Sequence, residues 1–255
     1  MPRAAPACRV PPPPAPDAPL AREVAATLDR LAPVPIPFIL ASRSPARLAT
    51  LRSAGIEPRV HISDVDEDAV LAAAADTFPL ERGRELTPAD AVLELARAKA
   101  EAVAELRDET EAIILGCDSM LELAGDIHGK PSNPDVARER WRMMRGRTGV
   151  LHTGHWLIRI RPEAGAAVYS GVGGTGSTVV HFADLEDSEI DAYVATGEPL
   201  HVAGAFTVDG LGGPFVEKIE GDHHNVVGVS LPLVRELLGE VGLRIPDVWA
   251  PRATQ

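Results

Sequence analysis

Asp118 is the side chain in this sequence best placed for chemistry. It follows an apolar run at residues 113–115 within the segment GCDS, residues 116–119. We therefore expect it at the carboxyl end of a buried strand, where open α/β sheets place their ligands. A carboxylate there can hold a divalent cation or take a proton from an attacking water. The alternative is an ordinary turn-forming Asp.

Residues 42–47, SRSPAR, carry groups that can bind an anion. The segment lies where a predicted strand leads into a helix, with Ser44 as the N-cap and Pro45 at the first helical position. Backbone N–H groups, two hydroxyls and the guanidinium groups of Arg43 and Arg47 can converge there on a phosphate. The alternative is a helix cap beside two solvated arginines.

Lys99 and Lys130 are two further cationic candidates. Lys99 shares a helical apolar stripe with Leu95 and Val103, so it points towards the core side of its helix. It either reaches an anionic ligand or acidic partner in a cleft, or extends from the edge of the stripe into solvent. Lys130 lies in GKP, residues 129–131, which is not a Walker A loop. With the arginines it can help to neutralise a triphosphate, whose charge is about −4.

Four acidic residues gather at positions 64–68. They can attract Mg²⁺ through one or two carboxylates and bound water, or they form a solvated acidic loop. If the segment is extended, Asp64 and Asp66 share a face that Glu67 does not.

Two other kinds of site are disfavoured. The histidine pairs at 152/155 and 223/224 have neither the helical spacing nor the cysteine partner of a zinc motif. The glycines at 171, 173, 174 and 176 lie inside a strand-like segment, unlike a dinucleotide fingerprint.

Strands and helices alternate through the first half of the chain. The patterns predict a strand at 38–41, helices at 44–55 and 87–106, a strand at 112–115 and a helix at 133–146. Strands at 150–160 and 167–181 form a long hairpin, and helices follow at 187–196 and 231–241. The sum is an α/β fold with a twisted mixed central sheet flanked by helices.

Composition and charge exclude several classes of protein. The formal net charge of −12 opposes association with nucleic-acid polymers and anionic membranes. No segment approaches the roughly 20 apolar residues of a membrane span, and the N-terminus lacks the apolar core of a signal peptide. The two cysteines, Cys8 and Cys117, do not suggest a disulfide framework. We expect a cytoplasmic protein.

Proline marks the domain boundaries. Residues 1–35 are Pro-rich and are expected to form a disordered N-terminal extension. The folded domain is expected at 36–247, with a C-terminal tail at 248–255.

The order of these motifs resembles the Maf-like nucleoside triphosphate pyrophosphatases, a family also described as inhibitors of septum formation. The resemblance covers about residues 36–245. It is carried by LASRSPAR (40–47), SDVDE (63–67), AKA (98–100), GCDS (116–119), GKP (129–131), YVATGEPL (193–200), GAF (204–206) and EGDHHNVVG (220–228). It implies two lobes around a cleft, a nucleoside triphosphate substrate, dependence on Mg²⁺ or Mn²⁺, and a homodimer.

The resemblance also assigns roles to residues. Asp118 becomes the residue that activates water, Lys99 and Lys130 are catalytic phosphate contacts, and Asp66 with Asp118 binds the metal. The substrate contacts are Ser42, Arg43, Ser44 and Arg47. Attack at the α-phosphorus then expels pyrophosphate, whose growing charge the cations stabilise.

Three positions that differ between subfamilies bear on the choice of base. A group acting on dTTP and UTP resembles Arg, Thr and Gln there, and a group acting on 7-methyl-GTP carries Trp, Gln and Glu. This chain has Ala46, Ser119 and Asp209, which fit neither set. If Asp209 faces the base, it accepts hydrogen bonds from N–H groups, and Ala46 leaves a roomier pocket. A surface turn at 209–210 is the alternative.

Two other functions compete with this interpretation. One is a nucleotide-binding regulator of cell division with little turnover. The other is a phosphatase that cuts elsewhere along the phosphate chain, since the same groups would serve that displacement.

Overall fold

The computed structural model of the chain describes residues 35–106, 111–164 and 166–251. Residues 1–34 of the predicted N-terminal extension, 1–35, lie outside the described residues, as do residues 252–255 of the predicted tail. Residues 248–250, also assigned to the tail, contact the domain. Val248 is buried, and the indole nitrogen of Trp249 donates to the carbonyl of Ala54 over 3.0 Å.

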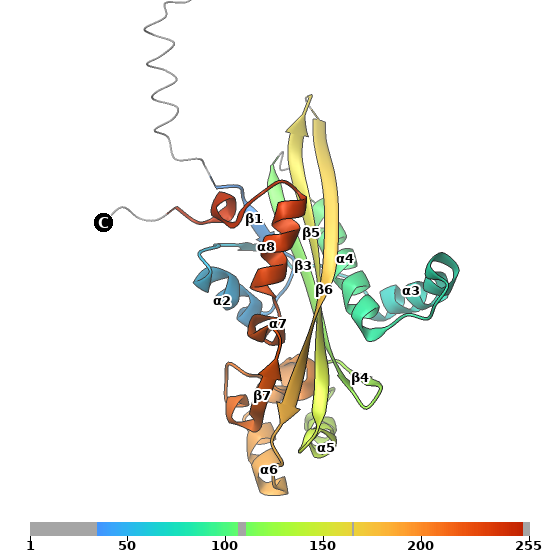
Figure 1. Cartoon of the computed structure of the whole chain (residues 1–255), viewed down its shortest axis with the longest axis vertical. Helices are drawn as coiled ribbons and strands as arrows, with labels where there is room; N and C mark the ends of the chain where they lie inside the picture. Colours follow the sequence, from blue (N-terminus) through green and yellow to red (C-terminus); the bar gives the residue numbers. More distant parts are fainter. Residues whose placement is uncertain (1–34, 107–110, 165, 252–255) are drawn as a thin grey trace, which may run out of the picture. The chain divides into compact units, whose positions relative to one another are not determined.

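A seven-stranded mixed sheet lies at the centre of the domain (Figure 1). Its order is β2-β1-β3-β5-β6-β7, with β4 paired to β3. β1 runs parallel to β2 and β3, and the remaining pairs are antiparallel. The strands are β1 (Phe38–Leu40), β2 (Arg59–Val60), β3 (Ala112–Leu123), β4 (Asp126–His128), β5 (Thr148–Glu163), β6 (Ala166–Phe182) and β7 (Val216–Glu220). The predicted α/β class with a mixed central sheet is confirmed.

Helices flank the sheet. They are α2 (Pro45–Ser53), α3 (Glu67–Arg82), α4 (Pro88–Glu105), α5 (Pro134–Met144), α6 (Asp187–Ala195), α7 (His223–Val227) and α8 (Leu231–Glu240). Short 3₁₀ turns follow at η1 (Glu198–His201), η2 (Ala203–Ala205), η3 (Gly213–Phe215) and η4 (Ile245–Val248). Four helices begin with a capping side chain and an adjacent proline, with Ser44, Thr87, Asn133 and Ser230 as the N-caps.

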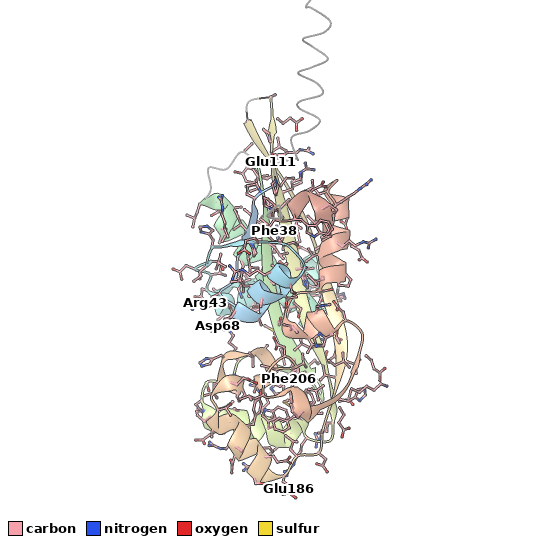
Figure 2. The ribbon with its side chains drawn as sticks, turned by 90° about the vertical axis from the view of Figure 1, so that its left-hand side faces the viewer. Phe38, Arg43, Asp68, Glu111, Glu186 and Phe206 are labelled. Carbon is pink, nitrogen blue, oxygen red and sulfur yellow. The ribbon has the colours of Figure 1, made fainter. Side chains whose placement is uncertain are left out.

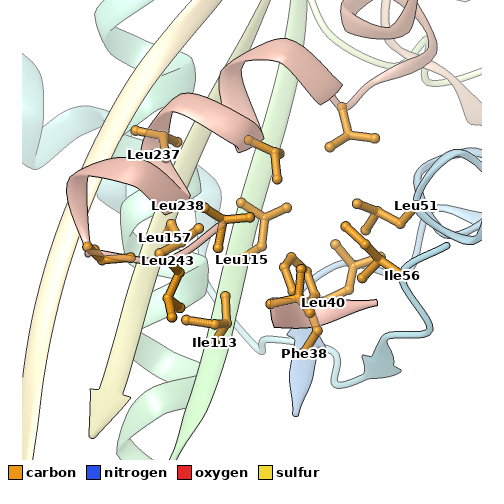
Figure 3. Close-up of a cluster of buried hydrophobic side chains, with 14 of the residues drawn as sticks. Phe38, Leu40, Leu51, Ile56, Ile113, Leu115, Leu157, Leu237, Leu238 and Leu243 are labelled. Carbon is orange, nitrogen blue, oxygen red and sulfur yellow. The ribbon is translucent and has the colours of Figure 1, made fainter. Parts of the chain in front are cut away.

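Alternation along β3 divides the buried side chains between the two faces of the sheet. Leu115 and Cys117 point to a core shared with α2 and α8, which Figure 3 shows around Leu40, Leu51 and Leu237. Ile114 points to the opposite face, where it packs with residues of α4. Further along the strand, Leu121 joins a separate core around α5 and α6. The long strands therefore carry distinct cores at their two ends.

The predicted extent of β3 is wrong. The strand continues to Leu123, so Asp118 lies within the strand and not at its carboxyl end. The apolar pattern stops at Leu115, but the antiparallel ladder with β5 extends β3 through Gly116 and beyond, with Cys117 opposite His155. Backbone pairing sustains the strand where side-chain hydrophobicity no longer marks it.

Helix α4 lies against the sheet because two glycines face it. A Cβ added to Gly116 would lie 2.1 Å from the carbonyl oxygen of Ala96, and one added to Gly154 would lie 2.1 Å from that of Val92. This close approach places Lys99 of α4 beside Asp118 of β3. Glycines of the strand-like segment have a similar packing role, since Gly171 and Gly173 leave room for the ring of Trp156.

Candidate active site

One edge of β3 is uncovered between two strands. β1 pairs with residues 113–115 and β4 with residues 121–123, and in the described part of the chain no strand pairs with that edge between them. A pocket of about 800 Å³ lies here, lined by residues 41–47 after β1 and by Ser119 of β3. Phe206 and Asp209 line it from the segment that packs on the α5/α6 core. Figure 2 shows Arg43 and Phe206 on the two halves of the domain that this pocket joins.

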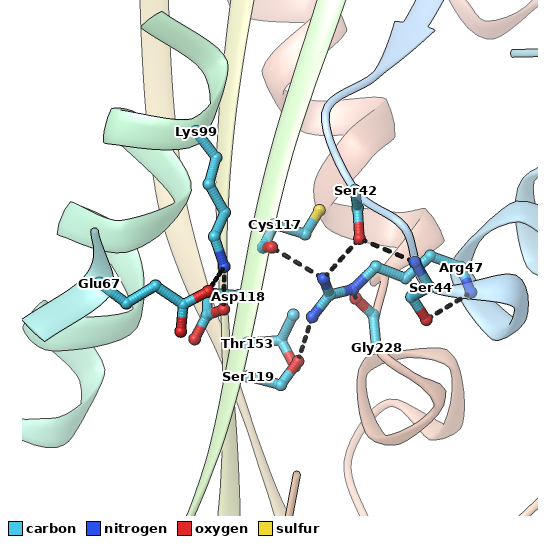
Figure 4. A network of polar contacts seen from close by, with 10 residues as sticks. All are labelled: Ser42, Ser44, Arg47, Glu67, Lys99, Cys117, Asp118, Ser119, Thr153 and Gly228. Atoms are coloured by element: carbon cyan, nitrogen blue, oxygen red, sulfur yellow. Dashed lines mark hydrogen bonds and ion pairs between the residues drawn. The ribbon is translucent and has the colours of Figure 1, made fainter. Parts of the chain in front are cut away.

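An ammonium group links two carboxylates beside the pocket (Figure 4). The Nζ atom of Lys99 lies 2.5 Å from Oδ1 of Asp118 and 2.7 Å from Oε1 of Glu67. The side chains of Lys99 and Asp118 are 11% and 13% exposed, whereas that of Glu67 is 55% exposed. Low exposure strengthens the attraction between Lys99 and Asp118 and limits their motion. The predicted inward direction of Lys99 is confirmed, and its acidic partners are Asp118 and Glu67.

The acidic segment differs from the predicted extended pattern. The side chain of Asp66 is the N-cap of α3, which was not predicted, and accepts a hydrogen bond from the backbone of Ala69 over 3.0 Å. Because the helix begins at Glu67, the alternation ends there and Glu67 turns towards Lys99. Asp64 and Glu67 line the pocket, whereas Asp66 is exposed and caps the helix.

Arg47 is held by the protein itself. Its Nε donates to the carbonyl of Gly228 over 2.7 Å, and Nη2 donates to Oγ of Ser119 over 2.9 Å. Nη1 donates to the carbonyl of Cys117 over 2.8 Å and to Oγ of Ser42 over 3.0 Å. Four of the five N–H groups of this guanidinium are thus engaged. Arg47 lines the pocket, but most of its donors fix the uncovered edge of β3 and the loop after β1.

The Arg47 network sets the direction of the neighbouring hydroxyls. The Oγ1 of Thr153 donates to the carbonyl of Asn225, so it accepts the proton of Ser119 over 2.9 Å. Ser119 in turn accepts from Arg47. Ser42 accepts from both Arg47 and the backbone N–H of Ser44, which leaves its own proton to donate. Ser42 is therefore poised as a donor at the pocket.

Two cations line the pocket without an acidic partner. Arg43 and Lys130 are both exposed, and neither forms an ion pair with any residue in the described ranges. Lys99 also lines the pocket, as do Ser42, Ser44 and Ala46. Every predicted site residue lines this pocket except Asp66 and Asp118. The carboxylate of Asp118 contacts Lys99, which does line the pocket. The pocket of this acidic protein therefore gathers several cations beside the acidic residues Asp64, Glu67, Glu198 and Asp209.

The loop that carries Asp209 is organised by Glu198, which was not predicted as a site residue. Its carboxylate accepts from the hydroxyls of Tyr193 and Thr207 and from the backbone N–H groups of Leu211 and Gly212, over 2.6–3.0 Å. Burial disfavours the charged carboxylate, but these donors outweigh it and lower the pKa of Glu198. Asp209 lies exposed at the pocket wall within this loop. Glu198 and Glu67 both fall in motifs singled out above, but nothing local indicates their contacts.

Two buried side chains of types that are often reactive, a cysteine and a histidine, are structural here. Burial raises the pKa of the Cys117 thiol to about 12, so it stays protonated. His155 is fully buried, and its Nε2 accepts the backbone N–H of Ser230 over 2.8 Å while Nδ1 donates to the carbonyl of Thr153 over 3.0 Å. This places one proton on Nδ1 and leaves the ring neutral.

The fold and the site define an α/β protein with a pocket that gathers several cations, built beside a largely buried carboxylate–lysine pair. The chain belongs to the Maf-like protein family, whose model matches residues 37–241. It is 53% identical to a nucleoside triphosphate pyrophosphatase of Rhodococcus jostii (strain RHA1) over 84% of this chain and 96% of that protein. Proteins of the same name from Nocardia farcinica (strain IFM 10152) and Streptomyces coelicolor (strain ATCC BAA-471 / A3(2) / M145) are 52% and 49% identical, over 83% and 84% of this chain and 96% and 95% of their own. Among the described residues, no helix is both long and apolar enough to cross a bilayer.

We predict that His155 makes stability fall below pH 6.5. Loss of solvent through burial and the nearby charge of Arg47 lower the pKa of His155 to about 3, from an ordinary value of 6.5. Between these two pH values the unfolded chain binds a proton that the folded chain does not. The free energy of unfolding therefore drops by about 1.4 kcal/mol for each unit by which the pH falls. Urea unfolding from pH 7.5 to 5 measures this slope. The variant His155→Gln lacks this titrating group. The difference in free energy of unfolding between wild type and variant should therefore become smaller by roughly 2 kcal/mol as the pH falls from 6.5 to 5. A constant gap would contradict the assignment.

Proposed function

We propose that the pocket binds a nucleoside triphosphate and hydrolyses it to a nucleoside monophosphate and pyrophosphate. The observation that carries the proposal is the largely buried Lys99–Asp118 pair beside a pocket whose walls also present Arg43 and Lys130. A carboxylate beside clustered cations suits hydrolysis of a polyanion, since one group activates water while the others bind phosphates. Relatives with about half of their residues identical to this chain carry the name of that activity.

In this mechanism Asp118 accepts a proton from the attacking water. The water oxygen forms a bond to the α-phosphorus, and the bond from that phosphorus to the bridging oxygen breaks, with its electron pair leaving on pyrophosphate. Lys99 fixes the orientation of the Asp118 carboxylate. Lys130 and Arg43 stabilise the charge that grows on the leaving group. The hydroxyl group of Ser42 donates a hydrogen bond to a phosphate oxygen. Arg47 acts chiefly by holding Ser42 and Ser119 in place.

The carboxylates near Lys99 fit a divalent cation bound mainly through substrate. The carboxylates of Asp118 and Glu67 both contact the Nζ atom of Lys99, so these two carboxylates lie close together. Within the described part of the chain, no group of three or more His, Cys, Asp or Glu side chains could hold a metal alone. Mg²⁺ commonly uses one or two carboxylates and completes its shell with water and substrate phosphates. When bound, Mg²⁺ or Mn²⁺ would supply charge stabilisation at the phosphates.

We propose Asp118 and Glu67 as the carboxylates for this cation. The metal role predicted for Asp66 has weaker geometrical support, because its carboxylate caps α3. Further properties carried over from the family resemblance are a homodimer and a cytoplasmic location. A regulator that binds nucleotides with little turnover is less well supported, since the acid and the cations needed for hydrolysis are all present at one pocket.

We expect Asp118→Asn to lower kcat for pyrophosphate release at least a hundredfold, because the amide cannot accept the proton. The measurement is pyrophosphate release from a panel of standard and modified nucleoside triphosphates with Mg²⁺ or Mn²⁺. Asp126→Asn, an exposed acid in β4, is the matched control and should retain wild-type activity. Orthophosphate and a diphosphate as products would instead place the cut at the terminal linkage. No release from any triphosphate would favour the nucleotide-binding regulator.

We expect Asp209 to influence which base is accepted. Its exposed carboxylate at the pocket wall can accept N–H donors from a base, and Glu198 holds the loop that presents it. Asp209→Gln should therefore change the ratio of kcat/KM between different bases by about tenfold, while pyrophosphate is still released. Glu217→Gln, on exposed β7, should leave this ratio unchanged. An unchanged ratio in Asp209→Gln would remove Asp209 from base selection.

A further inference from the structure

The backbone next to Lys130 is held from two directions. The carbonyl of Gly129 accepts Nη1 of Arg140 over 2.5 Å and the backbone N–H of Gly204 over 3.1 Å. Lys130 follows directly in the chain and is exposed at the pocket. A peptide group held by two donors fixes the starting point of the next side chain. These contacts therefore determine where the Lys130 ammonium can reach.

Arg140 differs from the other arginines of α5. Arg138 and Arg142 of this helix, and Arg145 at its C-cap, lie near the surface and pair with acidic side chains. Arg140 is only 7% exposed and has no ion pair among the residues that the structure describes. Its Nε is buried without a hydrogen-bond partner, and burial lowers the pKa of this guanidinium. A buried, unpaired charge is costly, so its position beside the Lys130 loop calls for a role there.

The same helix also holds a neighbouring segment of the pocket wall. The indole nitrogen of Trp141 donates to the carbonyl of Ala205 over 2.8 Å. Gly204 and Ala205 both have positive φ, 70° and 61°, which is uncommon for alanine and needs support from its surroundings. This turn leads directly into Phe206, which lines the pocket. Neighbouring residues of α5 thus anchor both the Lys130 loop and the turn before Phe206.

We propose that Arg140 is a positioning residue that acts through the Gly129 carbonyl to fix Lys130 against the phosphates of the substrate. The proposal rests on the phosphate-binding role of Lys130 in the proposed function. Arg140 does not line the pocket, and its acceptor is the carbonyl of the residue directly before Lys130, so we assign its effect on catalysis to Lys130. Because Lys130 contacts the phosphates and not the base, the effect should be the same for every nucleoside triphosphate.

The test is a double-mutant cycle between Arg140→Met and Lys130→Met. Arg140→Met should lower kcat/KM for pyrophosphate release about tenfold for each base, because the ammonium is no longer held in place. In the Lys130→Met background it should have less than about a twofold effect, since coupled residues are not additive. Arg140→Lys, which keeps a cationic donor, should recover activity to within about threefold of wild type. Arg142→Met is the matched control from the same helix and should behave as wild type.

A second readout is independent of turnover. Calorimetric binding of inorganic tripolyphosphate should weaken several-fold in Arg140→Met and show the same lack of additivity with Lys130→Met. If the wild type releases no pyrophosphate, the proposed reaction fails, and the binding cycle alone decides the role of Arg140. If Arg140→Met does not fold, as judged by thermal unfolding, the cycle is run with Arg140→Gln. Equal losses in both backgrounds, or no loss in either, would overturn the positioning role.

Discussion

The site depends on side-chain alternation along β3 where one edge of the strand lacks a neighbour. Pairing with β5 keeps residues 116–120 extended, so Asp118 faces α4 while Cys117 and Ser119 face α2. The uncovered carbonyl of Cys117 would be a backbone acceptor without a strand partner, and Arg47 satisfies it. One guanidinium thus completes the sheet edge and aligns Ser42 and Ser119. A shift of β3 by one residue would exchange these faces and separate Asp118 from Lys99.

Two unpaired cations are brought to one pocket of an acidic protein. The chain carries a net charge of −12, yet Arg43, Lys99 and Lys130 line one pocket, beside acidic residues. The charge of Lys99 is fully balanced by Asp118 and Glu67, whereas Arg43 and Lys130 have no acidic partner in the described ranges. The surrounding negative potential disfavours long polyanions, and the local cations favour a short one. This combination suits a free nucleotide better than a nucleic-acid strand.

Local signals in the sequence predicted much of this architecture. Cap and proline patterns located α2, α4 and α5, the apolar period located α8, and the apolar stripe gave the direction of Lys99. Features that depend on distant pairing were missed. The extension of β3 needs the ladder that sets Cys117 opposite His155, and the contact of Glu67 with Lys99 needs α3 to begin at Glu67. Likewise, Arg140 gives no sequence signal because its partner is a backbone carbonyl.

The position of bond cleavage is the central claim that one labelling experiment tests most directly. Hydrolysis of a nucleoside triphosphate in ¹⁸O-labelled water, followed by phosphorus NMR of the products, shows which phosphorus the water attacks. Because the proposed mechanism directs the water activated by Asp118 to the α-phosphorus, we predict the label in the nucleoside monophosphate and unlabelled pyrophosphate. Label in pyrophosphate, or in orthophosphate released with a diphosphate, would contradict it.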